Sequence, residues 1–325
     1  IRSHFGTLYN TYGFFALYAN IDNWKIDADK KVKNESKPEL DRWIASKLQS
    51  LIKEVTGFYE DYEPTKAARA IEKFVDEDLS NWYVRLNRRR FWKGEMSEDK
   101  QAAYETLFDC LNTVAQLMSP ISPFFSDWLY KNLNEGNSSV HVSYLVKADE
   151  TLIDKDLEER MELAQKISSM ILSIRKKENI RVRQPLNRIQ IPVLDDSYKA
   201  KIEAVKDLIL SEVNVKNLEL VDESHTQIVK NLKLNFKTLG KKCGKNMKAV
   251  QQFAAENAHA IISGIEKENK FEVKVGEEII LLESEDVEII PVDIPGWKVV
   301  NAGQLTVALD ITITEQLREE GLARE

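Results

Sequence analysis

Apolar residues in the first 133 positions recur at helical spacing, and short polar breaks divide them into separate segments. Phe5, Leu8, Tyr12 and Phe15 follow the three- and four-residue steps that place side chains on one face of a helix. Amphipathic helices joined by such short breaks pack as an antiparallel bundle. The sequence therefore predicts a helical bundle over residues 1–147. Its helices are expected at residues 5–19, 40–59, 66–92, 97–118 and 124–133.

Two local signals indicate where these helices begin and end. Ser36 and Glu39 are spaced as in a capping box, in which both side chains bond back to the backbone of the first turn. Pro38 between them is tolerated at the start of a helix. Gly94 is expected to end the third helix, because glycine readily adopts the left-handed conformation that closes many helices.

After residue 147 the helical periodicity gives way to short segments of mixed type. Ile189, Ile191 and Val193 alternate with polar residues as in a strand, and Pro192 predicts that this strand lies at a sheet edge. The fold class predicted for the whole chain is an α-helical bundle followed by smaller α+β modules, with an α/β junction module over residues 148–222 and a C-terminal α+β module over residues 223–325. The other expected elements are helices at 155–178, 197–212, 245–265 and from 315 onward, and strands at 215–221, 232–236, 271–275, 278–282, 287–290, 297–300 and 306–313.

The charge of the chain is unevenly distributed. A formal net charge of -7 would by itself argue against nucleic-acid binding, yet the cations gather in three islands. These basic islands are residues 85–93, 173–190 and 230–248, while acids dominate residues 277–288. Basic islands on an acidic body are typical of proteins that bind a polyanion at defined places. Composition alone leaves open the alternative that the islands are only solvated surfaces.

The first basic island belongs to the segment 78–93, which combines cations with large aromatic residues. On a helical wheel, Arg85, Arg88 and Trp92 cluster on one side, with Arg89 at the border, while apolar residues line the other side. Cations can pair with phosphates, and aromatic faces can stack on unpaired bases. The segment is therefore predicted to pack one face into the bundle and to present Arg85, Arg88, Arg89 and Trp92 to RNA.

Three residues of the same segment have a different expected role. Arg90 falls on the apolar side of the wheel, which predicts an ion pair with a buried acid or a contact with a neighbouring domain. Trp82 and Tyr83 are predicted to be structural. For Trp92, beside the cations, both base stacking and core packing remain open.

The other two islands suggest further contacts. In the second, Arg181 and Arg183 lie in an extended stretch before Pro185, where spaced cations can follow a phosphate backbone; a solvated interdomain elbow is the alternative. In the third, residues 239–246 resemble a phosphate-binding loop only in part, because the glycine spacing is one residue too short and Asn246 replaces the required Ser or Thr. We interpret this stretch as a strand-to-helix turn, with Lys241 and Lys245 as weak RNA contacts.

The sequence offers little support for other chemistry. The two cysteines and four histidines form no metal-binding motif, and no nucleophile, base and acid set stands out. We therefore expect no metal site and no catalytic residues. No apolar run approaches the roughly 18 residues of a membrane span, and no leader is recognisable, so a cytoplasmic protein without membrane contact is expected.

Three stretches resemble the isoleucyl-type class I aminoacyl-tRNA synthetases. Residues 10–20 are similar to the helix that follows the catalytic domain in that family, residues 78–92 to its anticodon-domain signature, and residues 181–186 to the element after the bundle. Residues 239–245 and 319–325 more weakly resemble the longer C-terminal region of the eukaryote-like branch.

The resemblance implies a role in tRNA recognition. Proteins of this family activate isoleucine with ATP and magnesium and transfer it to tRNA(Ile). Their His-Ile-Gly-His and Lys-Met-Ser-Lys-Ser signatures do not occur in this sequence. Catalytic and editing domains are therefore expected upstream of Ile1, and the chain itself is expected to bind tRNA(Ile) without any cofactor of its own. The alternative is a stand-alone helical adaptor that binds RNA or protein.

Overall fold

The structure is a computed structural model and forms two compact units, residues 1–161 (unit 1) and residues 162–325 (unit 2). The first division therefore lies 14 residues beyond the predicted boundary at 147, inside helix α7 (Lys155–Lys177). Glu158 explains this difference, because its carboxylate accepts hydrogen bonds from Ser46 and Ser50 of unit 1 at 2.6 and 2.7 Å. The residues that the structure describes are 2–27, 29, 31–134, 138–193, 195–221, 229–275, 278–292, 295–303 and 305–323.

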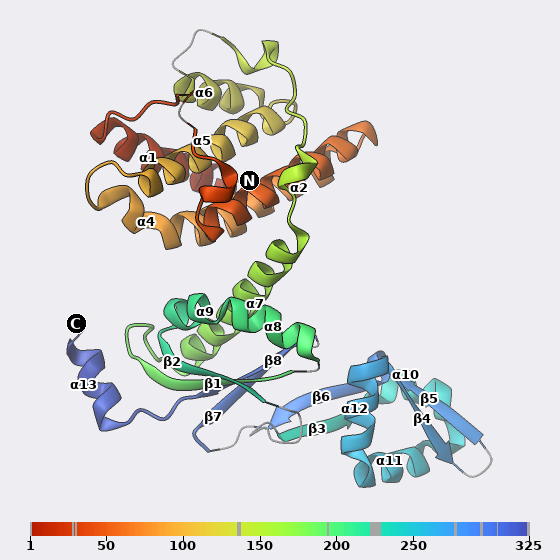
Figure 1. Cartoon of the computed structure of the whole chain (residues 1–325). Coiled ribbons are helices and arrows are strands. Elements are labelled where there is room, and N and C mark those ends of the chain that lie inside the picture. The colour runs from red at the N-terminus through yellow and green to blue at the C-terminus, as the bar shows by residue number, and fades with distance from the viewer. Residues whose placement is uncertain are drawn as a thin grey trace. The chain divides into compact units, whose positions relative to one another are not determined.

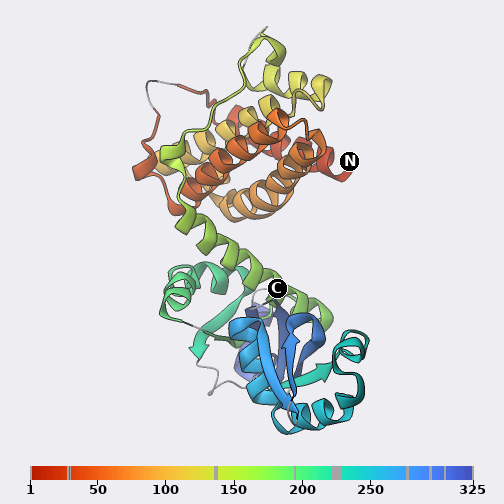
Figure 2. The ribbon, with the colours of Figure 1, turned by 90° about the vertical axis from the view of Figure 1, so that its right-hand side faces the viewer.

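Unit 1 is a bundle of helices, which confirms the fold class predicted for this part of the chain (Figures 1 and 2). Gly94, with φ +71°, follows the third predicted helix as expected. The capping box is not formed, because Ser36 ends a separate 3-10 turn and the second helix begins at Glu39 without a side-chain cap. The helices are α1 (Arg2–Ile21), α2 (Glu39–Glu60), α3 (Pro64–Lys73), α4 (Arg85–Trp92), α5 (Glu98–Met118) and α6 (Pro123–Leu133).

The core of unit 1 surrounds α5, whose side chains are buried on almost every side. Tyr104 of α5 stacks on Trp24, with ring centroids 5.3 Å apart, and meets the edge of Phe91 from α4 at 5.1 Å. Burying a side chain of this size stabilises the folded state by about 1.5–3 kcal/mol. These contacts hold α4 against α5 and so fix which of its faces points outward.

A π-helix over Phe74–Val84 connects α3 to α4 without a break. Its hydrogen bonds run from residue i to i+5, so the wheel with 100° per residue does not apply there. The regular α-helical geometry resumes at Arg85. The predicted wheel is therefore valid for α4, which carries the cations, and not for the preceding eleven residues.

Unit 2 contains a four-stranded sheet that joins distant parts of the sequence. The strand order is β2-β1-β8-β7, with β1 and β2 parallel and the other neighbours antiparallel. β8, from beyond residue 223, thus pairs with β1 of the junction module, and β7 pairs with β8, so the predicted boundary at 222/223 runs through the sheet. Its elements are β1 (Leu186–Pro192), α8 (Asp196–Ala204), α9 (Lys206–Val213), β2 (Val215–Val221), β7 (Trp297–Ala302), β8 (Leu305–Asp310) and the following α13 (Glu315–Ala323).

The prediction that Pro192 marks an edge strand is wrong, because β1 has a partner on both sides. Pro192 is the last residue of β1 and is paired with Val221 of β2. The next amide, that of Val193, donates to the Val221 carbonyl at 3.0 Å. Successive amides of a strand point to opposite sides, so the nitrogen of Pro192, which carries no hydrogen, faces β8. The pairing of β1 with β8 has already ended at Gln190, so no hydrogen bond is lost there.

The rest of unit 2 consists of two antiparallel strand pairs packed with helices. The apolar side chains of Leu239, Val250, Ile261, Val273 and Leu282 form its core. Residues 236–243 form a helix, so the predicted strand-to-helix turn at 239–246 is wrong. None of the helices in the described ranges is both long and apolar enough to cross a bilayer. The elements are β3 (Val229–Leu234), α10 (Phe236–Cys243), α11 (Met247–Glu256), α12 (Ala258–Glu268), β4 (Lys270–Val275), β5 (Glu278–Glu283) and β6 (Val287–Val292).

Candidate nucleic-acid interface

One face of α4 presents the four residues that the sequence predicted for RNA contact. Arg85, Arg88, Arg89 and Trp92 occupy positions i, i+3, i+4 and i+7 of the helix, and all four are exposed. Trp92 keeps 56% of its surface accessible, which leaves its ring free to stack. Within the described ranges, the side chains of Arg88 and Arg89 have no hydrogen-bond or ion-pair partner. We call these four residues the α4 face.

Arg85 differs from the other two arginines of the α4 face, because the protein already holds it. Its Nε donates to the carbonyl of Asn81 at 2.7 Å. Its guanidinium also lies 5.8 Å from the centroid of the Trp82 ring, within range of a cation–π contact. The buried Trp82 therefore holds the guanidinium of Arg85 in place, in keeping with the structural role predicted for Trp82.

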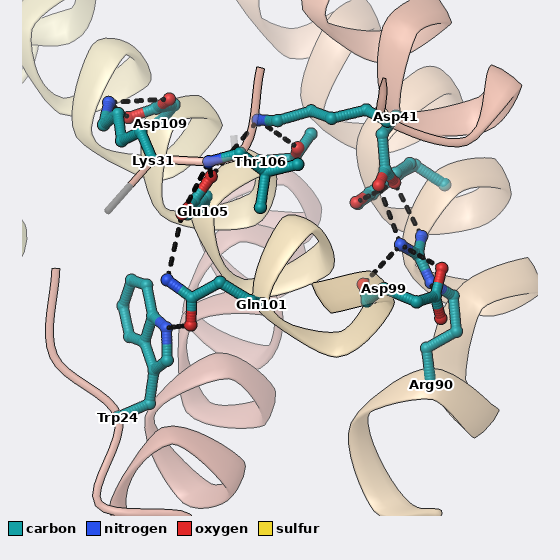
Figure 3. Close-up of polar contacts among 12 residues, drawn as sticks. Trp24, Lys31, Asp41, Arg90, Asp99, Gln101, Glu105, Thr106 and Asp109 are labelled. Atoms are coloured by element: carbon teal, nitrogen blue, oxygen red, sulfur yellow. Dashed lines mark hydrogen bonds and ion pairs between the residues drawn. The ribbon is translucent and has the colours of Figure 1, made fainter. Parts of the chain in front are cut away.

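The opposite side of α4 is fixed by Arg90. Its Nη1 and Nη2 donate to the two carboxylate oxygens of Asp41 on α2 at 2.7 and 2.8 Å, and its Nε donates to Asp99 at 3.0 Å (Figure 3). Asp41 is completely buried and also accepts the hydroxyl of Tyr83 at 2.7 Å. The predicted pairing of Arg90 with a buried acid is confirmed.

The electrostatics of this cluster follow from burial and charge. Burial alone would lower the pKa of Arg90, but the hydrogen bonds and charge of Asp41 outweigh it and raise the pKa above its ordinary value. Burial, reinforced by Asp41, raises the pKa of Tyr83 well above its ordinary value. Arg90 thus remains charged at any physiological pH and anchors α4 to α2, while the α4 face stays available.

A second polar network ties Trp24, Val32 and Lys37 to α5. The indole of Trp24 donates to Gln101 at 2.8 Å, and Gln101 donates to Glu105 at 2.9 Å (Figure 3). The buried Glu105 carboxylate also accepts the backbone amide of Val32 at 3.0 Å and lies 3.7 Å from the ammonium of Lys37. The segment after α1 is therefore tied to the helix that supports α4.

The second basic island contains a buried arginine that organises a loop. Arg175, at the end of α7, is only 1% exposed. It donates to the carbonyls of Arg181 at 3.2 Å and Gln184 at 2.9 Å, and to that of Asn214 at 2.9 Å. The side chain of Asn214 donates in turn to the carbonyls of Val182 and Arg183 at 2.9 and 3.0 Å. All four carbonyls of residues 181–184 are thus bound by Arg175 or Asn214.

This arrangement explains why Arg181 and Arg183 are exposed. The loop directs its carbonyls toward Arg175 and Asn214, so that the two predicted arginine side chains lie at the surface. Desolvation lowers the pKa of Arg175 to about 10, which still leaves it charged at neutral pH. Its structural role was missed from the sequence, although its position four residues after the buried Ile171 on α7 was a usable signal.

The third basic island is partly neutralised by the acidic run at 277–288. The ammonium of Lys242 bonds to Asp286 at 2.7 Å and also to Glu283. Burial would raise the pKa of Asp286, but the bond from Lys242 outweighs it and lowers the pKa. Lys233 lies opposite Glu288 in the β3–β6 pair. Pairing of this kind reduces the charge available to an RNA.

Lys241 and Lys245, the predicted contacts in this island, are only partly described. Their backbones lie in α10 and in the 3-10 turn Gly244–Asn246. Their side chains lie outside the described residues, so the RNA contact predicted for them stays a prediction.

One group of side chains could offer ligands to a cation. His4 of α1 approaches Glu72 and Asp76, with the ligand atoms of all three within 4.8 Å of one another. The Nδ1 of His4 lies 3.5 Å from an oxygen of Asp76, an ion-pair distance when His4 is protonated. Glu72 is exposed, and such exposed acids commonly gather without a metal. Their separation of about 70 positions in sequence hid this grouping from motif analysis.

Comparisons with known proteins agree with this geometry. Residues 41–191 match the family described as "Anticodon-binding domain of tRNA ligase", a range that includes the α4 face and the 181–184 loop. The whole chain is 53% identical to 28% of the isoleucine–tRNA ligase of Bacteroides thetaiotaomicron and 52% identical to 30% of that of Cytophaga hutchinsonii. Isoleucine–tRNA ligase 2 of Bacillus cereus is 37% identical over 98% of the chain and 30% of its own length. The chain thus spans less than a third of these curated relatives.

Proposed function

Because residues 41–191 of this chain belong to the anticodon-binding domains of tRNA ligases, we propose that the chain binds tRNA(Ile) through the α4 face. The observation that carries this proposal is the division of α4 into two sides. Arg90 is bound to a buried aspartate, while Arg88 and Arg89 have no partner within the described ranges and lie beside the exposed Trp92. A helix so divided is rigidly seated and yet presents cations and one aromatic ring to a ligand.

The chemistry of this face suits RNA. Each arginine that pairs with a phosphate releases a condensed counterion, so that binding is strong at low salt and weakens as salt rises. A planar guanidinium can also bind a phosphate through two parallel hydrogen bonds, which a lysine cannot do. Trp92 adds a surface on which an unpaired base can stack. Together these residues fit a loop of RNA better than an uncharged protein surface.

The whole protein is proposed to be an isoleucine–tRNA ligase, as its relatives are named. Its reaction would use ATP with magnesium to attach isoleucine to tRNA(Ile), in catalytic and editing domains elsewhere in the same cytoplasmic protein. This chain would hold the tRNA and so position its acceptor end, without a cofactor or catalytic residue of its own. Similarity along the full chain to ligases of one specificity favours this function over a stand-alone adaptor.

A binding experiment tests the role of the α4 face. Fluorescence anisotropy would measure the affinity of the 325-residue chain for a labelled tRNA(Ile) transcript over a range of salt concentrations. The double variant Arg88→Ala/Arg89→Ala should bind more weakly, and the slope of log K against log salt should become shallower by about 1.5–2, as expected for two lost phosphate contacts. Arg69→Ala, an exposed arginine on α3, serves as the matched control and should bind as the wild type does.

The same experiment can contradict the proposal in two ways. If the wild-type chain shows no salt-dependent affinity for tRNA(Ile), the chain is not a tRNA-binding module. If it does, but the double variant keeps the wild-type affinity and slope while remaining folded, the α4 face is not the contact surface. A tRNA of another amino acid tests the specificity and should bind less tightly.

A further inference from the structure

A buried histidine in the first turns of α1 faces two acids without a hydrogen bond to either. The side chain of His4 is only 9% exposed, and its Nδ1 is inaccessible to solvent and has no hydrogen-bond partner among the residues that the structure describes. The same holds for Oδ1 of Asp76, which lies 3.5 Å from it. Because buried polar atoms of native proteins almost always have a partner, two such atoms that face each other indicate a missing one.

Neither a direct hydrogen bond nor a bridging water fits the distance between these atoms. An N–H···O hydrogen bond joins atoms about 2.7–3.2 Å apart, which is less than the 3.5 Å between Nδ1 of His4 and Oδ1 of Asp76. A water bonded to both atoms at about 2.8 Å, with a tetrahedral angle, would hold them roughly 4.5 Å apart. Two donor atoms on one tetrahedral zinc ion, each about 2.0–2.2 Å from it, lie roughly 3.3–3.6 Å apart. The observed distance is therefore that of two ligands of one ion.

Glu72 supplies a third ligand atom. It lies on α3, four positions before Asp76 of the π-helix, and one atom from each of His4, Glu72 and Asp76 lies within 4.8 Å of the other two. The carboxylate of Glu72 ends a flexible side chain, so it can move the remaining distance of about 1 Å to reach an ion. Within the described ranges, neither acid forms an ion pair with a lysine or arginine. Two neighbouring carboxylates that lack such a partner favour the binding of a cation.

The surroundings of the three residues suit a bound ion. His4 and Glu72 line a pocket of about 270 Å³. Its other walls are largely apolar, and hydrocarbon of this kind lowers the local dielectric constant and strengthens the attraction between a cation and the carboxylates. Three protein ligands leave one position of a tetrahedral ion free, and the pocket has room for a water molecule there. The apolar side chains of the wall are those of Phe5, Ile71, Met118 and Ile121.

We propose that His4, Glu72 and Asp76 bind a zinc ion that links α1 to α3 and to the π-helix. One imidazole nitrogen and two carboxylate oxygens are ligands that zinc accepts. Magnesium and calcium prefer six or more oxygen ligands, so they suit the site less well. The ion would be a structural link within unit 1 and not a catalytic cofactor. The proposal goes beyond tRNA binding and departs from the absence of a metal site that the sequence led us to expect.

Zinc binding by the metal-free 325-residue chain tests the proposal. Competition with a fluorescent zinc indicator should give about one ion per chain, with a Kd of about 1 μM or tighter, and magnesium at the same concentration should not displace it. His4→Gln and Asp76→Asn each remove a ligand and should weaken binding by at least the roughly 10–100-fold that is lost with an outer hydrogen-bond partner. His141→Gln and Glu77→Gln remove an exposed histidine and an exposed acid outside the group, so both should bind zinc as the wild type does.

Two further measurements test the place of the ion and its structural role. With zinc at about 100 times its Kd, the unfolding midpoint of the wild type should rise by about 5–11 °C, and Asp76→Asn should show no such rise. X-ray absorption at the zinc edge should show nitrogen and oxygen ligands at about 2.0–2.2 Å and no sulfur at about 2.3 Å. The absorption measurement uses the wild-type chain, so it decides the question even if a variant fails to fold.

Several results would overturn the proposal. These are a wild-type chain that binds no zinc, a sulfur ligand in the absorption spectrum, and wild-type affinity in a folded Asp76→Asn variant. Weaker zinc binding by His141→Gln would place the ion elsewhere and have the same consequence. No RNA is present in these measurements, so their failure would leave the α4 face untouched, and a failure of tRNA binding would leave the zinc site untouched.

Discussion

Replacing Arg90 should destabilise unit 1 far more than replacing either neighbouring arginine on the α4 face. Arg90→Gln removes two charged hydrogen bonds to Asp41, at 2.7 and 2.8 Å, and the contacts to Asp99. Asp41 cannot turn toward water, because its side chain is completely buried between α2 and α4. It would keep the hydroxyl of Tyr83 as a partner but lose Arg90, the one cation that pairs with it among the residues the structure describes.

The size of the effect follows from this geometry. Removing one partner of a buried ion pair typically costs about 3–5 kcal/mol, because the other charge stays buried and unpaired. For a unit of this size each kcal/mol lowers the unfolding midpoint by about 2–4 °C, which gives a decrease of about 6–20 °C. Arg88→Gln, at an exposed position, should change the stability by about 0.5 kcal/mol or less. Arg90→Lys keeps the charge but loses the bidentate contact, so its loss of stability should lie between those of Arg88→Gln and Arg90→Gln.

Tryptophan fluorescence provides a suitable assay. Five of the six tryptophans lie in unit 1, so thermal unfolding followed by fluorescence reports mainly on that unit. Arg90→Gln and Arg88→Gln are compared with the wild type at the same pH and salt concentration. An unfolding midpoint of Arg90→Gln within about 2 °C of that of Arg88→Gln would refute the reasoning, because Asp41 would then have found solvent or another partner.

Asp127→Asn should lower the stability at neutral pH and remove one contribution to the loss of stability at acidic pH. Hydrogen bonds from Lys131 and Ser139 lower the pKa of Asp127 from 3.8 to about 2, so its contribution is complete above about pH 4 and is lost as the pH falls toward 2. The difference in melting temperature between wild type and variant should therefore shrink between pH 4 and 2; a constant difference would contradict this. Arg175→Met should loosen the 181–184 loop at a cost of about 1.5–3 kcal/mol, because it removes the charged hydrogen bonds to three carbonyls, while those of Arg181 and Asn214 keep a backbone amide as partner. Hydrogen exchange in that loop should be faster, and tRNA binding weaker, than in the wild type. Unchanged exchange would refute the role of Arg175 in holding the loop.

Much of the first unit was predictable because its signals are local. The helices of the bundle follow from apolar spacing over a few turns, and the α4 face follows from the same rule at positions 85, 88, 89 and 92. The pairing of Arg90 was also predictable in kind, since a cation on the apolar side of a helix requires an acid. The identity of that acid was not, because Asp41 lies 49 positions earlier in the sequence.

Unit 2 was harder to predict for the same physical reason. Strand pairing depends on partners that are distant in sequence, so nothing near β1 shows that β8 will lie beside it. Folding also pairs or buries some of the cations of the basic islands. Lys242 is bound by the acids around Asp286, and Arg175 is buried among backbone carbonyls. Charge counted along the chain does not reveal which of these cations will be paired.

The sequence by itself determined the helical bundle, the character of the α4 face and the resemblance that points to tRNA, because each depends on residues within a few helical turns. Only the tertiary structure decided which cations remain available. Pairing with Asp41 and burial among carbonyls remove Arg90 and Arg175 from any role at the surface. The packing of α1 also brings His4 to Glu72 and Asp76, which lie about 70 positions later in the sequence. Such contacts depend on distances through space, which one sequence does not contain.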